Sequence, residues 1–353
     1  MKVFVLNTGG TIGMVGHPLR PALTAAELYK GLKVPGDTQL ELKEFYRLQD
    51  STNIPHSDRI QMCQEIASVY QDYDAFVVLH GTDSLAETTA VFCMVFKQTL
   101  QKPVLVIGSQ MSREEPGTDA VMQLENSLRL AASFVRKGVV GVYTVCVGDV
   151  FDGSRLKKQR ESDPNYVDSP GRPPVAHVWP RIMHLDGLKH RDAALAIQGL
   201  RLDTIYERRV WSLSEARRDT NPIGLRIIVD SGEYKGIIIQ CKGAGQLSDQ
   251  PWEDAEGKQT CSWIEAVKYA TDRGVYCAIL SPFQDGRVIL TRYELGQKLK
   301  DAGALSLESL TPDMADFKFR QALGIFPDDP ARIQEFLSAN LVNELLPGLE
   351  DER

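Results

Sequence analysis

Two short segments of this sequence place threonine hydroxyls beside glycines, directly after apolar runs. The segment TGGTIG spans Thr8–Gly13 and follows the run Val3–Leu6, whereas HGTD spans His80–Asp83 and follows Ala75–Leu79. A threonine hydroxyl can act as a nucleophile, and a nearby carboxylate can bind an ammonium group or orient a base. Each segment alone also has a plainer interpretation, because glycines form tight turns and Thr-Asp-Ser sequences commonly cap helices.

Three further segments carry polar side chains after apolar runs. They are Asp50-Ser51, Gly108–Gln110 and the loop that ends at Lys158. A lysine near threonines can serve as a base when burial and a neighbouring cation lower its pKa, although most loop lysines are solvated. Open α/β sheets bind ligands beyond the carboxyl ends of their strands. Because all five segments follow predicted strands of one domain, together they indicate a functional site.

Hydrophobic patterning predicts the elements that position these segments. Runs apolar on both faces are typical of parallel strands buried between helices. The predicted strands are Val3–Leu6, Leu42–Leu48, Ala75–Leu79, Pro103–Ile107 and Val139–Val147. The predicted helices are Ser57–Tyr70 with Ser57 as its N-cap, Thr88–Gln98 and Ala120–Val135. This alternation predicts an open, mostly parallel sheet with helices on both faces.

A second, smaller α/β domain is expected in the C-terminal part. The stretch from Glu161 to Asn221 is rich in Pro, Asp and Arg, and its later part resembles a linker. Beyond it we predict strands Leu225–Val229, Gly236–Gln240 and Val275–Leu280, with helices Ser262–Thr271 and Pro330–Leu345. The expected organisation is an N-terminal domain over 1–205, a linker over 206–222 and a smaller C-terminal α/β domain over 223–353.

Length and composition exclude several classes of protein. The 353 residues suit two domains, and the net charge of −7 gives no electrostatic footprint for nucleic acid or a membrane surface. No apolar run reaches the roughly 20 residues that span a bilayer, and the N-terminus is interpreted as a strand rather than a signal peptide. The 6 cysteines have no C-x-x-C spacing, so a reducing, cytoplasmic location is expected. We find no convincing metal-ligand cluster.

Taken together, these motifs resemble the bacterial-type L-asparaginases, and within them the cytoplasmic type I branch. The resemblance rests on Thr8–Met14, Asp50-Ser51, His80–Asp83, Gly108–Gln110 and Lys158. Their order and spacing match over most of residues 1–169, and a looser match continues to the C-terminus. The resemblance implies an L-asparagine amidohydrolase that forms L-aspartate and ammonia without a metal or cofactor.

The resemblance also implies catalytic roles. Thr11 is expected to be the nucleophile, and Thr82, Asp83 and Lys158 the second threonine and its proton relay. Asparagine's amide is a poor electrophile, so an activated hydroxyl and a stabilised oxyanion are needed. Thr11 would form an acyl-enzyme that water then hydrolyses. The Thr82 backbone N–H is a candidate oxyanion donor, and His80 is expected to be structural.

Substrate contacts are implied in the same way. Asp50 and Ser51 correspond to the residues that bind the α-amino and α-carboxylate groups, and Asp83 also binds the ammonium. The backbone carbonyl of Gln110 corresponds to the group that holds the side-chain amide of the substrate. Thr82 completes the substrate-binding set.

The chain departs from the family pattern at several positions. Leu19 occupies the place of a tyrosine that many members carry in a mobile loop after TGGTIG. Gln123 and Ser154 stand where asparagine is expected, and Gly243–Gln246 replaces the family's G-x-G-N. The segment Asp230–Lys235 is too short for the helix that relatives place between two strands, so we expect a trimmed small domain with altered dimer contacts.

Alternative functions remain open. The same machinery could act on L-glutamine, D-asparagine or another small amide. A subunit of the archaeal tRNA amidotransferase is a further relative, although such subunits carry an additional N-terminal module and the first strand here starts at Val3. A non-catalytic amino-acid-binding homologue is the third possibility, supported only by Leu19. By resemblance, the protein is expected to form a homodimer or homotetramer, with a small-molecule substrate as its ligand.

Overall fold

The computed structural model describes residues 1–36, 38–214 and 216–348. Contacts divide the chain into two compact units, Met1–Thr204 and a second that begins at Ile205. Residue 215 of the expected linker and residues 349–353 of the expected C-terminal domain lie outside the described residues. No helix of the described part is long and apolar enough to cross a membrane.

The first unit is built on an eight-stranded sheet with the order β12-β11-β8-β7-β6-β5-β1-β4. The strands are β1 (Lys2–Gly9), β4 (Gln39–Gln49), β5 (Ala75–Leu79), β6 (Pro103–Ile107), β7 (Gly141–Cys146), β8 (Asp149–Asp152), β11 (Ala176–His177) and β12 (Met183–His184). The strands from β4 to β7 run parallel, and β8, β11 and β12 pair antiparallel. The predicted open, mostly parallel sheet is therefore confirmed.

Two small ribbons and several helices surround this sheet. The ribbons pair β2 (Met14–Val15) with β3 (Arg20–Pro21), and β9 (Lys157–Lys158) with β10 (Val167–Asp168). The helices are α1 (Ala25–Tyr29), α2 (His56–Ser68), α3 (Leu85–Phe96), α4 (Ala120–Lys137) and α5 (Ala193–Gln198). The predicted helix Ser57–Tyr70 begins earlier, at His56, so the N-cap is Pro55, whose backbone is extended, and Ser57 lies inside the first turn.

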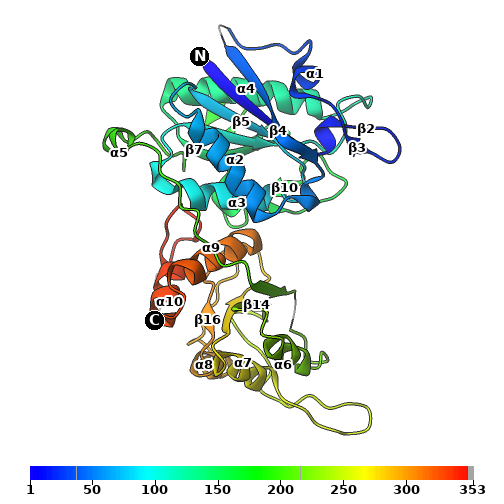
Figure 1. Ribbon diagram of the computed structural model, residues 1–353, viewed down its shortest axis with the longest axis vertical. Coiled ribbons are helices and arrows are strands. Elements are labelled where there is room, and N and C mark those ends of the chain that lie inside the picture. The colour runs from blue at the N-terminus through cyan, green and yellow to red at the C-terminus, as the bar shows by residue number, and fades with distance from the viewer. Residues whose placement is uncertain (37, 215, 349–353) are drawn as a thin grey trace. The chain divides into compact units, whose positions relative to one another are not determined.

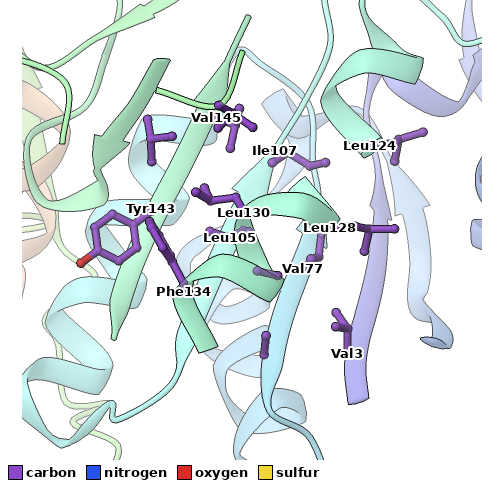
Figure 2. Packing of buried hydrophobic residues seen from close by; sticks show 14 of the residues in the cluster. Val3, Val77, Leu105, Ile107, Leu124, Leu128, Leu130, Phe134, Tyr143 and Val145 are labelled. Carbon is purple, nitrogen blue, oxygen red and sulfur yellow. The ribbon is translucent and has the colours of Figure 1, made fainter. Parts of the chain in front are cut away.

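Helices cover both faces of the sheet, as predicted. Figure 1 shows α4 on one side of the strands and α2 with α3 on the other. On the α4 side, alternate strand residues such as Val77 and Leu105 meet Leu128 and Phe134 (Figure 2). Their strand neighbours point to the opposite face and are also buried. Because both faces are buried, these strands are apolar throughout, which made them easy to recognise in the sequence.

The second unit contains a parallel sheet of four strands with the order β13-β14-β15-β16. The strands are β13 (Val210–Leu213), β14 (Gly236–Gln240), β15 (Tyr276–Leu280) and β16 (Leu305–Ser306). The helices are α6 (Ile223–Asp230), α7 (Trp263–Thr271), α8 (Glu294–Asp301), α9 (Pro312–Ile325) and α10 (Pro330–Ser338). The smaller α/β domain is thus confirmed as a separate unit.

The structure corrects one strand prediction in this unit. Leu225–Val229 belongs to helix α6, and the first strand is β13, which lies within the segment expected to be a linker. Only Leu225 and Val229 are buried on α6, a spacing of four residues that suits one helix face. The domain is therefore not trimmed at Asp230–Lys235, because α6 itself is the helix between the first two strands.

Two side-chain contacts stabilise the C-terminal helices of this unit. The Lys318 ammonium is fully buried and donates to the Leu337 carbonyl at 2.9 Å and to a Glu344 carboxylate oxygen at 2.7 Å. Gln334 of α10 accepts from the Ser306 backbone N–H at 2.7 Å and donates to the Ser306 carbonyl at 3.1 Å. These contacts attach α9, α10 and the edge strand β16 to one another.

Candidate functional site

Two glycines let the end of β1 touch both neighbouring strands. Gly9 has a φ of +105°, and a Cβ there would lie 2.4 Å from the Gln49 carbonyl oxygen. Gly10 has a φ of +85°, and a Cβ there would lie 2.3 Å from the backbone nitrogen of Gly81. Only glycine combines this left-handed conformation with so close an approach. Thr11 is therefore held next to the loop that carries Thr82.

Glycines in the neighbouring loops continue this close packing. A Cβ at Gly81 would lie 2.5 Å from the Ser51 hydroxyl oxygen, and one at Gly108 would lie 2.8 Å from the His80 carbonyl oxygen. The ends of β1, β4, β5 and β6 thus converge at one edge of the sheet, as the strand-end argument predicted. Together with the Lys158 loop, they bring the five predicted segments to this edge.

Thr11 opens a short 3₁₀ turn, Thr11–Gly13, immediately after β1. The loop after β6 supports this turn, because the Arg113 N–H donates to the Ile12 carbonyl at 3.2 Å and the Ser112 hydroxyl donates to the Met14 carbonyl at 2.5 Å. Thr11 itself is partly exposed. The loop after β6 thus holds the backbone on both sides of this turn, and Thr11 is not fully covered by the protein.

Thr82, Asp83 and Lys158 contact one another directly. The Lys158 ammonium lies 2.5 Å from an Asp83 carboxylate oxygen and donates to the Thr82 hydroxyl at 3.3 Å. Lys158 comes from β9, and the other two residues follow β5, so the contact joins chain segments 75 residues apart. A hydroxyl, an amine and a carboxylate in this order can pass a proton.

Gln110 connects this group with the loop that follows Lys158. Its side-chain oxygen accepts from the Thr82 hydroxyl at 3.2 Å, and its side-chain nitrogen donates to the backbone carbonyls of Glu161 at 2.8 Å and Asp163 at 3.3 Å. The Gln110 backbone N–H donates to Asp119 at 3.0 Å. The Gln110 side chain therefore makes contacts that the sequence did not suggest, since only its backbone carbonyl was singled out.

Asp50 and Ser51 lie at the end of β4 beside the Thr82 loop. The Asp50 carboxylate accepts from the Thr52 backbone N–H at 2.9 Å and caps a short 3₁₀ turn, Ser51–Asn53. The Ser51 backbone carbonyl accepts from the Ser84 hydroxyl at 2.7 Å, and Ser51 is buried. A carboxylate and a serine at this edge can bind the charged end of an amino acid.

His80 is buried and forms part of a hydrogen-bonded chain behind the site. Its Nδ1 lies 2.8 Å from the Gly81 carbonyl oxygen, and its Nε2 lies 2.8 Å from the Thr88 hydroxyl. The Arg59 Nε donates to Thr88 at 3.0 Å, and Arg59 pairs with Glu87 at 2.8 Å. Burial lowers the pKa of His80 to about 4, so the ring is neutral at pH 7. The residue fits the structural role expected for it.

The charge of Lys158 is set by competing effects. Burial alone lowers the pKa of Lys158, but its hydrogen bonds to Asp83 and Glu161 outweigh burial and raise the pKa above the ordinary lysine value. The Glu161 carboxylate lies 2.6 Å from the ammonium. Lys158 is therefore charged in this state, opposite to the sequence-based picture of a base with a lowered pKa.

Sequence reasoning missed the supporting residues Ser112, Asp119 and Glu161. Asp119 accepts from the backbone N–H groups of both Gln110 and Met111, which fixes the loop after β6. A signal for Asp119 existed, since it directly precedes a strongly periodic helix.

Leu19, which takes the place of the tyrosine in the family pattern, is 42% exposed in the loop between β2 and β3. Among the described residues, no group of three or more His, Cys, Asp or Glu side chains could hold a metal ion.

Two known protein-family domains match most of the chain. Residues 2–187 match the family described as Asparaginase, N-terminal, and residues 216–337 match the Glutaminase/Asparaginase C-terminal domain. The chain is 28% identical to a Glutamyl-tRNA(Gln) amidotransferase subunit of Thermococcus kodakarensis, over 98% of this chain and 77% of that protein. It is 25% identical to L-asparaginase 1 of Escherichia coli K12, over 98% of both proteins.

Solved structures share the fold over nearly the whole chain. The thermostable L-asparaginase from Thermococcus kodakarensis superposes with a TM-score of 0.84 at 25% identity, covering 99% of this chain and 100% of the other. L-asparaginase I from Vibrio cholerae superposes with a TM-score of 0.80 at 22% identity, covering 98% and 99% of the two chains. Both units of the chain thus have counterparts in proteins of known structure.

Proposed function

The chain belongs to the asparaginase family, and on that premise we propose that it hydrolyses the side-chain amide of L-asparagine to L-aspartate and ammonia. One observation carries the proposal. Lys158 contacts both the Thr82 hydroxyl and the Asp83 carboxylate in the loop against which Gly10 packs, directly before Thr11. Two threonines, an amine and a carboxylate at one strand edge are the groups that an acyl transfer through a hydroxyl requires.

In the proposed reaction, Thr11 attacks the side-chain carbonyl carbon of asparagine. The C–N bond then breaks, the leaving nitrogen takes up the proton that the Thr11 hydroxyl has given up, ammonia departs, and an ester to Thr11 remains. Water hydrolyses this ester and returns the hydroxyl to Thr11. Thr82 and Lys158 move the protons, and the Thr82 backbone N–H, just before helix α3, can donate to the oxyanion.

The same proposal assigns the binding of the amino-acid end. Asp50 and Asp83 are acidic groups suited to the α-ammonium, and Ser51 is suited to the α-carboxylate. The Gln110 backbone carbonyl is suited to accept from the substrate's amide nitrogen. These assignments predict that a substrate needs both charged groups, so simple amides without an amino-acid end are expected to react poorly.

Assembly and location follow as further proposals. We expect a homodimer or homotetramer, which light scattering coupled to size-exclusion chromatography measures directly. The six cysteines are all free and buried, which supports a reducing compartment, the cytoplasm.

A second candidate function is favoured by the 28% identity to an amidotransferase subunit. In that case the chain would release ammonia as one component of a larger enzyme that amidates another substrate. The two candidates differ in what the isolated chain does with free amino acids. A chain that works alone should release ammonia from free L-asparagine.

Ammonia release from L-asparagine, L-glutamine and D-asparagine is the deciding assay. We expect activity on L-asparagine in the unchanged protein and none in Thr11→Ala or Thr82→Ala. Thr220→Ala, the same change at an exposed position, is the matched control and should retain activity. Preference for another amide would refute the L-asparagine assignment, and substantial activity in Thr11→Ala would refute the nucleophile. Inactivity on all three amides would favour the second candidate.

A further inference from the structure

Four residues close a ring of polar contacts in the candidate site. Thr82 donates to Gln110 at 3.2 Å, Gln110 donates to the Glu161 backbone carbonyl at 2.8 Å, and the Glu161 carboxylate lies 2.6 Å from the Lys158 ammonium. Lys158 completes the ring by donating to Thr82 at 3.3 Å, while Asp83 binds the same ammonium from outside the ring. Glu161 contributes twice, through its backbone and through its side chain.

The direction of these hydrogen bonds has a chemical meaning. The Gln110 side-chain oxygen can only accept, so the Thr82 hydroxyl proton points toward Gln110. An ammonium can only donate, so the Thr82 hydroxyl oxygen accepts a hydrogen bond from Lys158 and does not donate one to it. In this arrangement Lys158 cannot accept the Thr82 proton.

We propose that Glu161 is a positioning residue whose carboxylate holds Lys158 in its donating state and whose backbone holds Gln110 on Thr82, so that Glu161 must leave Lys158 before Lys158 can act as a base. The proposal rests on the proposed amidohydrolase function. It goes further because Glu161 lies outside the recognised motifs, and its carboxylate must move before a proton can pass from Thr82 to Lys158.

The charges around Lys158 support this assignment. The groups that face its ammonium are Asp83, from the loop after β5, and Glu161, from its own loop. The Glu161 side chain is 81% exposed, whereas the Lys158 side chain is only 15% exposed. An exposed carboxylate can rotate into solvent at little cost, and the largely covered ammonium of Lys158 is less free to do so. In the same loop, Arg160 pairs with Asp163 at 3.9 Å.

The proton balance explains why the second carboxylate matters. An amine accepts a proton from Thr82 only after its ammonium has released one to water. Each neighbouring carboxylate makes that release harder, and together Asp83 and Glu161 raise the pKa of Lys158 above its ordinary value. Removal of Glu161 from the ammonium leaves one carboxylate and makes the neutral amine more frequent.

The test compares Glu161→Gln with Asp163→Asn in the full chain. Both changes remove one negative charge from the same loop without removing a backbone carbonyl. The carbonyls of both residues accept from Gln110, but only the Glu161 carboxylate contacts Lys158. Asp163→Asn also retains an oxygen that can accept from the Asn165 N–H, as Asp163 does at 2.8 Å. The pair therefore isolates the contact with Lys158 from the general loss of charge.

The first readout is the rate at which acetic anhydride labels Lys158 between about pH 8 and 9.5, measured by mass spectrometry relative to the exposed Lys300. Only the neutral amine reacts, so below its pKa the rate follows the neutral fraction. Loss of the partly screened Glu161 carboxylate should lower the pKa of Lys158, because one of the two groups that favour the ammonium is removed. We therefore expect labelling to rise about three- to tenfold in Glu161→Gln and to stay unchanged in Asp163→Asn. An unchanged rate in Glu161→Gln, or equal rises in both variants, would overturn the proposal.

The second readout is the pH profile of kcat/KM on L-asparagine. The ascending limb should move to lower pH in Glu161→Gln and should stay in place in Asp163→Asn. A limb that does not move in Glu161→Gln would overturn the link between Glu161 and catalysis. If the unchanged protein hydrolyses no amide, the proposed function fails, whereas the labelling experiment still decides whether Glu161 controls the charge of Lys158.

Discussion

Replacement of Gly10 by alanine tests whether close backbone packing aligns the two threonines. The new Cβ would lie 2.3 Å from the Gly81 nitrogen and 2.4 Å from the Gly81 Cα. Carbon atoms in ordinary contact lie roughly 3.5–4 Å apart, so the two loops must separate by about 1 Å. A displacement of that size between reacting groups costs about a hundredfold in rate. We therefore expect kcat/KM to fall at least about a hundredfold.

A matched control separates packing from backbone strain. Gly31 has a φ of +78°, close to the +85° of Gly10, but nothing lies within 4 Å of a Cβ placed there. Alanine at either position would have a positive φ, which costs stability of the order of 1–3 kcal/mol, and Gly10 is at the upper end because its ψ of 172° is allowed almost only for glycine. Gly31→Ala should lose that stability and keep its activity, whereas Gly10→Ala should lose both.

The assay is ammonia release from L-asparagine with urea denaturation of the same samples. Activity is compared only for protein that is folded at the assay temperature. A folded Gly10→Ala protein whose kcat/KM stays within about threefold of the unchanged protein would refute the reasoning. The two loops would then tolerate separation, and the alignment of Thr11 with Thr82 would need another cause.

Two further predictions concern stability. Because burial lowers the pKa of His80 from 6.5 to about 4, the folded state resists protonation, so its stability is complete above about pH 6.5 and declines as the pH falls. We expect a loss of roughly 3 kcal/mol by about pH 4, measured by urea denaturation, and an identical decline in His80→Gln would contradict it. Lys318→Met would remove the buried ammonium that pairs with the Glu344 carboxylate at 2.7 Å and should destabilise the second unit by about 3–5 kcal/mol. A loss below about 1 kcal/mol would show that the pair is dispensable.

The sheet edge was predictable because its parts obey local rules. Parallel strands buried on both faces are continuous apolar runs, and glycines with hydroxyl side chains directly after them mark strand ends. The segment Ala75–Leu79 followed by Thr82 and Asp83 shows this clearly, since the strand has the predicted bounds. Order along the chain and strand pairing then suffice to bring the polar residues to one edge.

The errors arose where one pattern fits two structures. Leu225–Val229 is a five-residue apolar run, and periodicity over so short a window does not distinguish a buried strand from a helix. The surrounding structure determines that this run is helical, because β13 already provides the first strand of the sheet. Helices α8 and α9 went unpredicted, although Pro312 at the start of α9 is a favourable first-turn residue.

Glu161 could not be recognised from the sequence for a different reason. It lies in an irregular, charged loop where a glutamate is most simply explained as a solvated side chain. Its importance depends on the fold, which brings Lys158 and Gln110 to either side of it. Contacts that bridge separate loops have no local signal, so the charge state of Lys158 was also misjudged.

The amide of Gln334 has the same donor and acceptor as a peptide group, and it uses them on the outward-facing N–H and C=O of Ser306 in β16. An open strand edge is a template on which another chain can add and start aggregation. Here the Gln334 side chain of α10 occupies the N–H and C=O of Ser306, to which a further strand would otherwise bind. The protection is independent of charge and pH, unlike the lysines that guard many edges, so it persists where electrostatic repulsion between molecules would fade.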